Sequence, residues 1–282
     1  MSVRRWHLAH GRHLDLGDAS VIMGILNVTP DSFSDGGRFA AVDAAVDQAR
    51  RMADEGAAII DVGGESTRPG AEAVTADEEQ RRVLPVVEAL ASTDILISVD
   101  TYREETARLA VQAGAHVVND VWGLSREPGI ARVASETGAG LVIMHTGRGR
   151  HKLPDVIEDQ FQFLREALEK AESYGVHREQ IILDPGFGFA KETADENIAL
   201  MSRTREILNL GYPLLVGVSR KRFLGTLTGR EPEARDVATA AANALLRLQG
   251  ADIFRVHNVR ASRDALLIAD AARGAHIESQ DL

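Results

Sequence analysis

Short apolar runs alternate with amphipathic segments along nearly the whole chain. Eight runs have the length and composition of buried strands: 21–26, 58–62, 95–99, 117–119, 140–144, 181–183, 214–218 and 253–256. Sequence with helical spacing separates each run from the next. Because alternation of buried strands and amphipathic helices requires parallel strands, eight such units predict a (β/α)8 TIM barrel, with a doubly wound open sheet as the alternative.

Two of the connecting segments carry clear helical signals. The first has apolar residues at helical spacing and ends near Gly56; these residues are Val42, Ala45, Val46, Ala49, Met52 and Ala53. In the second, the spacing recurs at Val237, Ala240, Ala241, Ala244, Leu245 and Leu248. Asp236 is placed to cap this helix and Gly250 to end it.

The length favours one domain, because a barrel of about 250 residues would use nearly all of the 282. Residues 1–20 alternate loosely and predict a short hairpin or cap before the first core strand. We expect the barrel to span 21–273 and a tail to follow at 274–282.

Composition narrows the class of partner. A formal charge of −10 without a long Lys/Arg run argues against nucleic acid or an anionic membrane as a partner. The absence of cysteine excludes disulfides and thiolate metal sites. No signal peptide and no apolar run of about 18 residues is evident, so we expect a cytoplasmic protein.

Polar groups stand at the end of every apolar run. They are Asn27, the segment 61–68, Asp100, Asn119, His145, Asp184, the turn 219–221, and Arg255 with His257. Asp100 or Asn119 alone could be a helix cap, but helix capping does not explain all eight positions. In a barrel these groups form one ring at the carboxyl ends of the strands, where active sites of this fold lie.

The ring has two chemical halves. Arg255 and His257, with Arg68 and Asn27, suit a polyanion, since Arg offers phosphate a planar fork of donors. The Asn27 amide oxygen is a reasonable Mg²⁺ ligand when phosphates supply the others. Asp100, Asn119 and Asp184 form an acceptor-rich wall for a flat heterocycle with an amino-pyrimidine donor edge.

Three loops add to this interpretation. The stretch 21–37 runs from a buried strand into a polar, glycine-closed loop, with Asn27 at the junction. Between the glycines of DPGFGFAK (184–191), Phe187 and Phe189 can line a planar ligand. VSRKRFLG (218–225) offers Lys221 at a helix start that favours a carboxylate or phosphate.

Seven ordered segments resemble the dihydropteroate synthase family of folate biosynthesis. They are GILNVTPDSFSDGG, DVGGESTRPGA, SVDT, VVND, DPGFGFAK, GVSRKRFLG and FRVHNVR, within 21–261. The resemblance implies a transferase that joins 6-hydroxymethyl-7,8-dihydropterin diphosphate to 4-aminobenzoate, releases diphosphate with Mg²⁺ assistance, and is commonly a homodimer.

The resemblance also implies residue roles. Asp100, Asn119, Asp184 and Lys221 would hold the pterin, together with Phe189; Asn27, Thr67, Arg68, Arg255 and His257 would hold the diphosphate and its metal, with Asn27 as the metal ligand. Ser219, Phe33 and Pro69 would shape the aminobenzoate pocket. Asp35, Lys221 and Arg255 are the candidate catalytic residues. Asp35 is the candidate to face the positive charge that develops on the pterin as diphosphate leaves.

The chain departs from the family pattern at two places. After the fifth strand it reads MHTGRGRHKLPD, where the family commonly continues Met-His-Met. In the last strand the usual His-Asp is His257-Asn258. We expect this second change to be tolerated, because Asn258 alternates away from the face of His257.

Two other functions remain as alternatives. One is a methyltetrahydrofolate-type pterin-binding methyltransferase domain, which has no diphosphate to anchor and so does not need Arg68, Lys221, Arg255 and His257. The other is a catalytically silent paralogue that binds a pterin.

Overall fold

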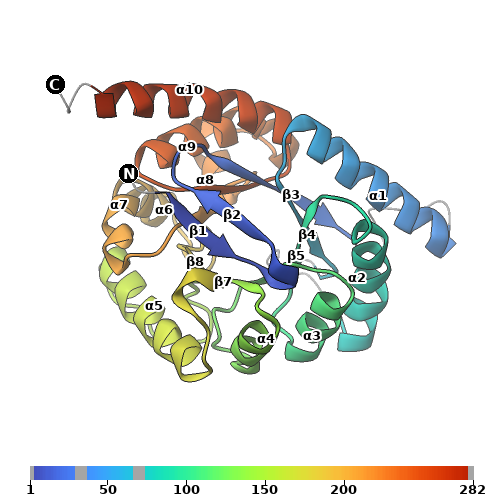
Figure 1. Cartoon of the computed structure of the whole chain (residues 1–282). Coiled ribbons are helices and arrows are strands. Elements are labelled where there is room, and N and C mark those ends of the chain that lie inside the picture. The colour runs from blue at the N-terminus through green and yellow to red at the C-terminus, as the bar shows by residue number, and fades with distance from the viewer. Residues whose placement is uncertain (1–2, 29–36, 66–73, 279–282) are drawn as a thin grey trace.

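Eight parallel strands form a barrel in the computed structural model, which describes residues 3–28, 37–65 and 74–278 (Figure 1). The sheet order is β8-β7-β6-β5-β4-β3-β10-β9, and a parallel bridge between Leu183 and Leu214 joins the outer strands β8 and β9. The strands are β3 (Val21–Asn27), β4 (Ile59–Gly63), β5 (Leu96–Asp100), β6 (Val117–Asp120), β7 (Gly140–Met144), β8 (Ile181–Asp184), β9 (Leu215–Val216) and β10 (Ile253–Val256). The predicted barrel and all eight strands are confirmed.

Helices surround the barrel (Figure 1). The α-helices are α1 (Gly37–Glu55), α2 (Ala76–Leu90), α3 (Glu104–Gln112), α4 (Gly129–Thr137), α5 (Val156–Ser173), α6 (Ala194–Ser202), α7 (Thr204–Ile207), α8 (Arg222–Thr228), α9 (Asp236–Leu248) and α10 (Val259–Glu278). Short 3-10 helices are η1 (Ala9–Gly11), η3 (Arg178–Gln180), η4 (Leu208–Leu210) and η5 (Pro232–Ala234). Within the described ranges, no helix is both long and apolar enough to cross a membrane.

Side chains alternate between the barrel interior and the helical layer. Outward residues such as Ile60, Ile97 and Phe254 belong to the large core beneath the helices. Inward residues at the start of the strands form a second apolar cluster, whose strand members are Val21, Met23, Ile59, Leu96, Val117, Val142, Ile182, Leu215 and Ile253. The amino-terminal half of the barrel interior is therefore filled with apolar side chains.

A hairpin closes this amino-terminal end, as the sequence predicts. β1 (Arg4–His7) pairs antiparallel with β2 (His13–Leu16), and Figure 1 shows both strands crossing the mouth of the barrel. Trp6 is 1% exposed, packs in the inner apolar cluster, and donates its indole N–H to the Gln180 carbonyl at 2.7 Å.

Of three predictions about the helices, the one for Asp236 is wrong, the one for Gly250 is confirmed, and the last helix is longer than expected. Asp236 does not cap α9: it is the first helical residue, and its carboxylate accepts from Arg220 and Asn258. Gly250 follows the end of α9 with φ +104°, as expected of a residue that ends a helix. The last helix continues to Glu278, past the predicted barrel end at 273.

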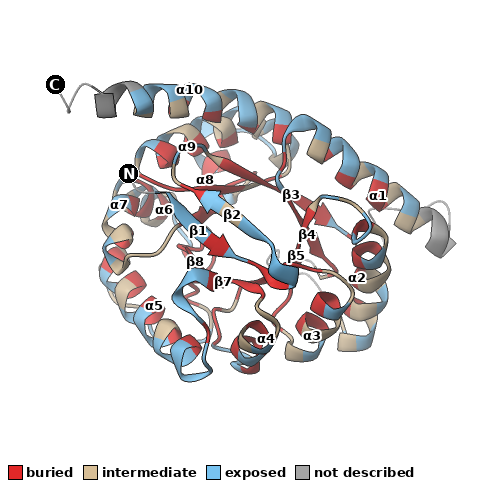
Figure 2. Ribbon diagram, in the orientation of Figure 1, coloured by how far each residue is buried: buried red, intermediate tan, exposed pale blue. Residues whose placement is uncertain are grey.

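The apolar stripe read from the sequence of α9 lies on its outer side. Val237, Leu245 and Leu248 are exposed, while the inner side of the helix buries Leu246 and Arg247. Figure 2 shows the general pattern, with buried residues on the barrel strands and exposed residues on the outer sides of the helices. Arg247 can be buried because it is paired with Asp270 and Asp252. Because the side of α9 that carries the paired Arg247 faces the protein, the side that carries the apolar residues faces solvent.

Candidate active site

The barrel interior turns from apolar to charged halfway along the strands. Parallel pairing places Asp61 of β4 beside Ser98 of β5, and Asp100 of β5 beside Asn119 of β6. All four are buried. The carboxyl-terminal half of the interior is thus a polar chamber, at the end of the barrel where the sequence places the site.

Arg255 on β10 binds two carboxylates across this chamber. Its Nε donates to Asp61 Oδ2 at 2.6 Å, and its Nη2 donates to Asp100 Oδ2 at 2.7 Å. Asn119 Nδ2 also donates to Asp61 Oδ2, at 3.1 Å. The two halves expected from the sequence therefore meet, because Arg255 contacts the carboxylate wall.

Burial raises the pKa of the two acids in the chamber and lowers the pKa of its lysine, because it disfavours the charged form of each. It raises the pKa of Asp100 to about 7, with Arg255 opposing the rise and Asp61 adding to it. It raises the pKa of Asp184 to about 6, against the hydrogen bond from Gly186. It lowers the pKa of Lys221 to about 8. Burial disfavours the charged form of each of these groups because it removes hydrating water. A ligand with matching polar groups would replace that water with hydrogen bonds and so would bind favourably here.

Asp184 lies at the end of β8, where a tight loop fixes its carboxylate. The Gly186 N–H donates to Asp184 Oδ1 at 2.7 Å. Gly186 has φ +65°, and a Cβ added there would lie 2.0 Å from the His145 carbonyl oxygen. Only glycine fits at this turn.

One wall beside Asp184 is apolar. Val121, Met144 and Phe189 form a small buried cluster, with Trp122 packed against it. Lys221 lies with its Nζ 4.0 Å from the centre of the Phe189 ring. An apolar wall of this kind suits the face of a flat, electron-rich heterocycle.

Phe187 does not line this wall, contrary to the expectation from its glycine-rich loop. It is fully buried in the main core and stacks on Phe223, with ring centres 6.3 Å apart. Phe187 and Phe189 are two residues apart, but Gly188 between them has φ +76°, so strand alternation does not apply and only Phe189 reaches the site.

His257 and Ser219 contact each other at the rim. Ser219 Oγ lies 2.9 Å from His257 Nδ1 and accepts the His257 backbone N–H at 3.1 Å. Asn258 donates to Asp236 at 2.8 Å; its orientation away from the face of His257 stays a prediction from the sequence. Ser219, predicted for the aminobenzoate pocket, therefore adjoins a residue predicted for the diphosphate.

Asn27 ends β3 with an exposed side chain, and its amide oxygen lies 3.9 Å from the position of a Cβ added to Gly63. No group of three or more His, Cys, Asp or Glu suited to a metal occurs among residues 3–28, 37–65 and 74–278. Five predicted site residues fall outside the described residues: Phe33, Asp35, Thr67, Arg68 and Pro69.

Two residues of the chamber were not named as site residues from the sequence. Asp61 was included only as the first residue of the segment 61–68; it is fully buried in the middle of β4, and its Oδ1 has no hydrogen-bond partner. A carboxylate at an inward position of an apolar strand was the available signal. Met144 was hidden in an ordinary apolar run, and the sequence carries no signal of its place beside Phe189.

A parallel barrel with this chamber is a site for a flat polar heterocycle. The chain matches the family described as "Pterin binding enzyme" over residues 23–257. It is 46% identical over 248 residues to the dihydropteroate synthase of Bacillus subtilis, covering 88% of this chain and 86% of that protein.

Solved structures agree. A Clostridium difficile dihydropteroate synthase, determined in the presence of pteroic acid, has a TM-score of 0.88 and 45% identity, covering 92% of this chain and 98% of that chain. One from Xanthomonas albilineans, with 4-aminobenzoic acid, has a TM-score of 0.89 and 45% identity, covering 95% and 98%. The chain belongs to the pterin-binding enzyme family and, within it, to the dihydropteroate synthases.

Proposed function

We propose that the chain joins 6-hydroxymethyl-7,8-dihydropterin diphosphate to 4-aminobenzoate, giving 7,8-dihydropteroate and diphosphate. The observation that carries the proposal is the acceptor wall. The Asp61 Oδ1 oxygen is buried without a partner, and Asp184 is ionisable but only 5% exposed. An unpaired buried acceptor is costly, and the donor edge of an amino-pyrimidine would satisfy it.

The chemistry needs no strong base. The bond from the pterin methylene carbon to the diphosphate oxygen breaks, and its electron pair leaves with diphosphate. The lone pair of the aromatic amine, which is unprotonated at neutral pH, forms the new carbon–nitrogen bond, and one amine proton is released. The enzyme then acts by positioning and by electrostatic stabilisation.

The residues divide these tasks. Asp184, Asp100, Asn119 and the unpaired Asp61 Oδ1 would hold the pterin edge, while Phe189 supports one ring face. Lys221 and Arg255 place positive charge beside the leaving group. The Coulomb effect of Asp184 favours the charged form of both bases. Asp35, in the first loop, is the group we assign to the developing cation.

Mg²⁺ would be held by Asn27. One amide oxygen is a suitable protein contribution, because Mg²⁺ keeps several waters and takes its remaining ligands from substrate phosphates. When bound, the metal would neutralise charge on the departing diphosphate. Thr67, Arg68 and His257 would take the other diphosphate oxygens.

The aminobenzoate pocket would form from Ser219 with Phe33 and Pro69. Ser219 is 6% exposed and is fixed by His257. The pocket would therefore lie next to the diphosphate subsite, as attack on the methylene carbon requires.

A homodimer is the second part of the proposal. Adjacent helices α9 and α10 carry exposed apolar residues, namely Val237, Leu245, Leu248, Leu267 and Ile268. Val237 is 83% exposed and Ile268 73%. Large apolar side chains exposed on two adjacent helices are typical of a protein interface. Val237→Asp should yield monomers in analytical ultracentrifugation, and an unchanged dimer would contradict this face.

A turnover assay with both substrates tests the activity. We expect 7,8-dihydropteroate by mass spectrometry only with Mg²⁺ present, because Asn27 and the basic side chains leave diphosphate charge uncompensated. Full turnover in excess chelator would contradict the metal assignment. Pterin binding without product would instead favour a silent paralogue. The cytoplasmic location stays a prediction from the sequence.

A further inference from the structure

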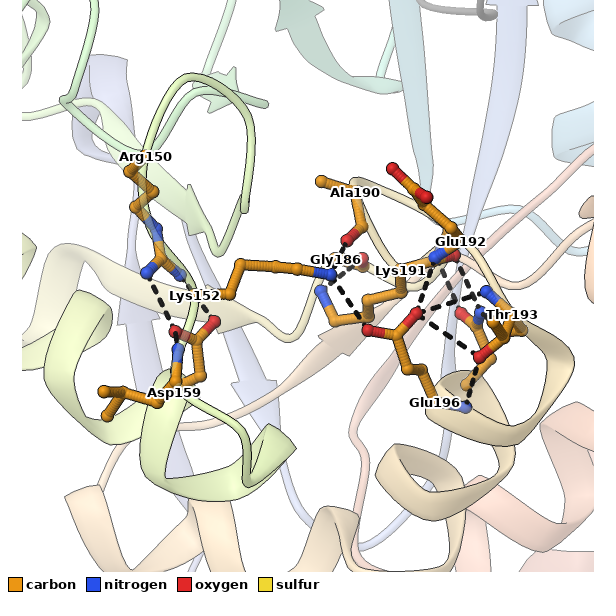
Figure 3. A network of polar contacts seen from close by, with 12 residues as sticks. Arg150, Lys152, Asp159, Gly186, Ala190, Lys191, Glu192, Thr193 and Glu196 are labelled. Atoms are coloured by element: carbon orange, nitrogen blue, oxygen red, sulfur yellow. Dashed lines mark hydrogen bonds and ion pairs between the residues drawn. The ribbon is translucent and has the colours of Figure 1, made fainter.

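Lys191 joins the loop after β8 to the loop after β7, and the proposed reaction does not use it. Its side chain is 5% exposed. Its Nζ donates to the Gly186 carbonyl at 2.9 Å and to His145 Nδ1 at 3.0 Å. Figure 3 shows Lys191 beside Gly186, and shows the Arg150–Asp159 pair on the other side of Lys152. His145 links Lys191 to Asp159.

Gly186 connects Lys191 to the pterin wall. Its carbonyl accepts from Lys191, and its N–H donates to Asp184 Oδ1 at 2.7 Å. The residue has no room to shift toward β7, because its Cα is packed against the His145 carbonyl. Two hydrogen bonds through this single, tightly packed residue therefore connect the Lys191 ammonium to the Asp184 carboxylate.

The hydrogen bonds behind Lys191 indicate the tautomer of His145. Since Nδ1 of His145 accepts from the ammonium, we assign the proton to Nε2, which donates to Asp159 Oδ2 at 2.9 Å. Arg150 Nη2 lies 2.8 Å from the same Nε2, so in this tautomer its N–H is directed to Asp159 Oδ2 and not to the ring. Burial and the neighbouring Lys191 lower the pKa of His145 to about 4, so the ring is neutral. Arg150 holds Asp159 with two bonds, of 2.8 and 2.6 Å.

The charge of Lys191 also acts on Asp184. Burial lowers the pKa of Lys191 to about 7, while Asp184 and Asp159 favour its charged form, and Lys152 and Arg150 oppose it. In return Lys191 lowers the pKa of Asp184 against the effect of burial.

We propose that Lys191 is a positioning residue of the pterin site, which sets the orientation and the ionisation of Asp184 through Gly186 and is itself held by His145. This inference rests on the proposed function of Asp184 as a pterin ligand. It gives the loop at 145–155, where the chain departs from its family, a supporting role.

Lys191→Met tests the inference, because methionine fills similar space without donors or charge. Lys152→Met is the matched control: Lys152 bonds to the Ala190 carbonyl at 2.6 Å and to Glu196 at 2.9 Å, thus joining the same loops without contacting Gly186. The readouts are 6-hydroxymethylpterin affinity by calorimetry and the Asp184 pKa by carboxyl-carbon NMR.

We expect Lys191→Met to weaken pterin binding on the order of tenfold and to raise the pKa of Asp184, while Lys152→Met leaves both near wild type. With Asp184→Asn already present, Lys191→Met should have little further effect on affinity. Equal effects of the two lysine variants, or additive losses with Asp184→Asn, would overturn the positioning role.

Lys191→Gln decides the question if the methionine variant does not fold. It keeps one donor for Gly186 but loses the charge, so the pKa of Asp184 should rise while affinity falls less. A wild-type protein that fails to bind pterin would refute the proposed function alone, because the Asp184 titration still reports on Lys191. Normal wild-type binding with an unchanged Asp184 titration in Lys191→Gln would refute only this inference.

Discussion

The two ends of the barrel are built from the same strands but differ in what their inward positions contain. At the amino-terminal end these positions hold Val, Ile, Leu and Met, covered by the β1–β2 hairpin. At the carboxyl-terminal end they hold Asp61, Asp100, Asn119, Asp184 and Arg255, four of them almost without exposure. Strand pairing is the same at both ends, so it does not decide function; the residue types at alternate positions do.

The difference has an energetic meaning. Apolar burial stabilises the amino-terminal end by roughly 25 cal/mol per Å² of apolar surface removed from water. Charged groups at the other end are costly to bury, even where Arg255 pairs with two of them. We therefore expect substitutions to affect stability at one end and ligand binding at the other.

The largest effect should come from Trp6→Ala. Removing this buried indole from the hairpin should lower the free energy of unfolding by about 3 to 5 kcal/mol, as measured by urea denaturation. Turnover per folded molecule should be nearly unchanged. Trp6→Phe, which loses mainly the bond to the Gln180 carbonyl, is the milder control. Loss of turnover at full stability would break the division between the two ends.

Asp184→Asn should show the opposite behaviour. Replacing a charged acceptor should cost about 1.5 to 3 kcal/mol of pterin binding, or about 10- to 150-fold in affinity, with little loss of stability. Asp252→Asn is the control, since Asp252 is also buried but lies at the start of β10, where it accepts from Leu214. Unchanged affinity in a folded Asp184→Asn protein would remove the pterin assignment.

The next largest effect concerns the order in which the two substrates bind. If Asn27 and Arg68 engage diphosphate and metal, the aminobenzoate pocket is complete only after the pterin substrate arrives. Labelled aminobenzoate should bind about 5- to 150-fold more tightly with a pterin and Mg-diphosphate bound than alone. Equal affinity in both conditions would mean that the pocket is preformed.

The pH dependence should also differ between the two ends. The pKa of Asp184 is raised to about 6 and that of Asp100 to about 7, so kcat/KM for the pterin substrate should fall below about pH 7 as these acceptors become protonated.

The free energy of unfolding should also depend on pH, and the buried acids and the buried histidine should change it in opposite directions. Because the folded state binds more protons at these two acids, their contribution to the free energy of unfolding decreases as pH rises from about 4 to 7. His116, at the base of β6, has its pKa lowered to about 4 by burial, so its contribution is lost as pH falls from about 6.5. Comparing His116→Asn and Asp184→Asn in urea denaturation across this range separates the two ends; identical pH profiles would contradict the assignment.

The sequence was sufficient for the fold because each strand and helix carries its own periodicity. β7 and β10 have the predicted bounds, and the ring of polar strand ends follows from those bounds. Contacts between distant strands were less accessible. Nothing in the sequence indicates that Arg255 reaches Asp61 and Asp100 at the same time.

Local patterns failed where backbone conformation or pairing overrides them. Phe187 is turned into the core because its loop has residues with positive φ, including Ala190 at +54°. The stripe on α9 faces outward because Arg247 is buried against Asp270 and Asp252 on the inner side. The sequence gives no signal that distinguishes Lys191 from other lysines in loops, although in the structure it donates to the Gly186 carbonyl.

A crystal structure with 6-hydroxymethylpterin bound tests the central claim most directly, namely that the charged end of the barrel is the pterin site. We predict the amino-pyrimidine edge against Asp184, Asp100 and Asn119, one ring face on Phe189 and the other beneath Arg255. A pterin bound outside the barrel interior, with the Asp61–Arg255–Asp100 contacts unchanged, would contradict the account.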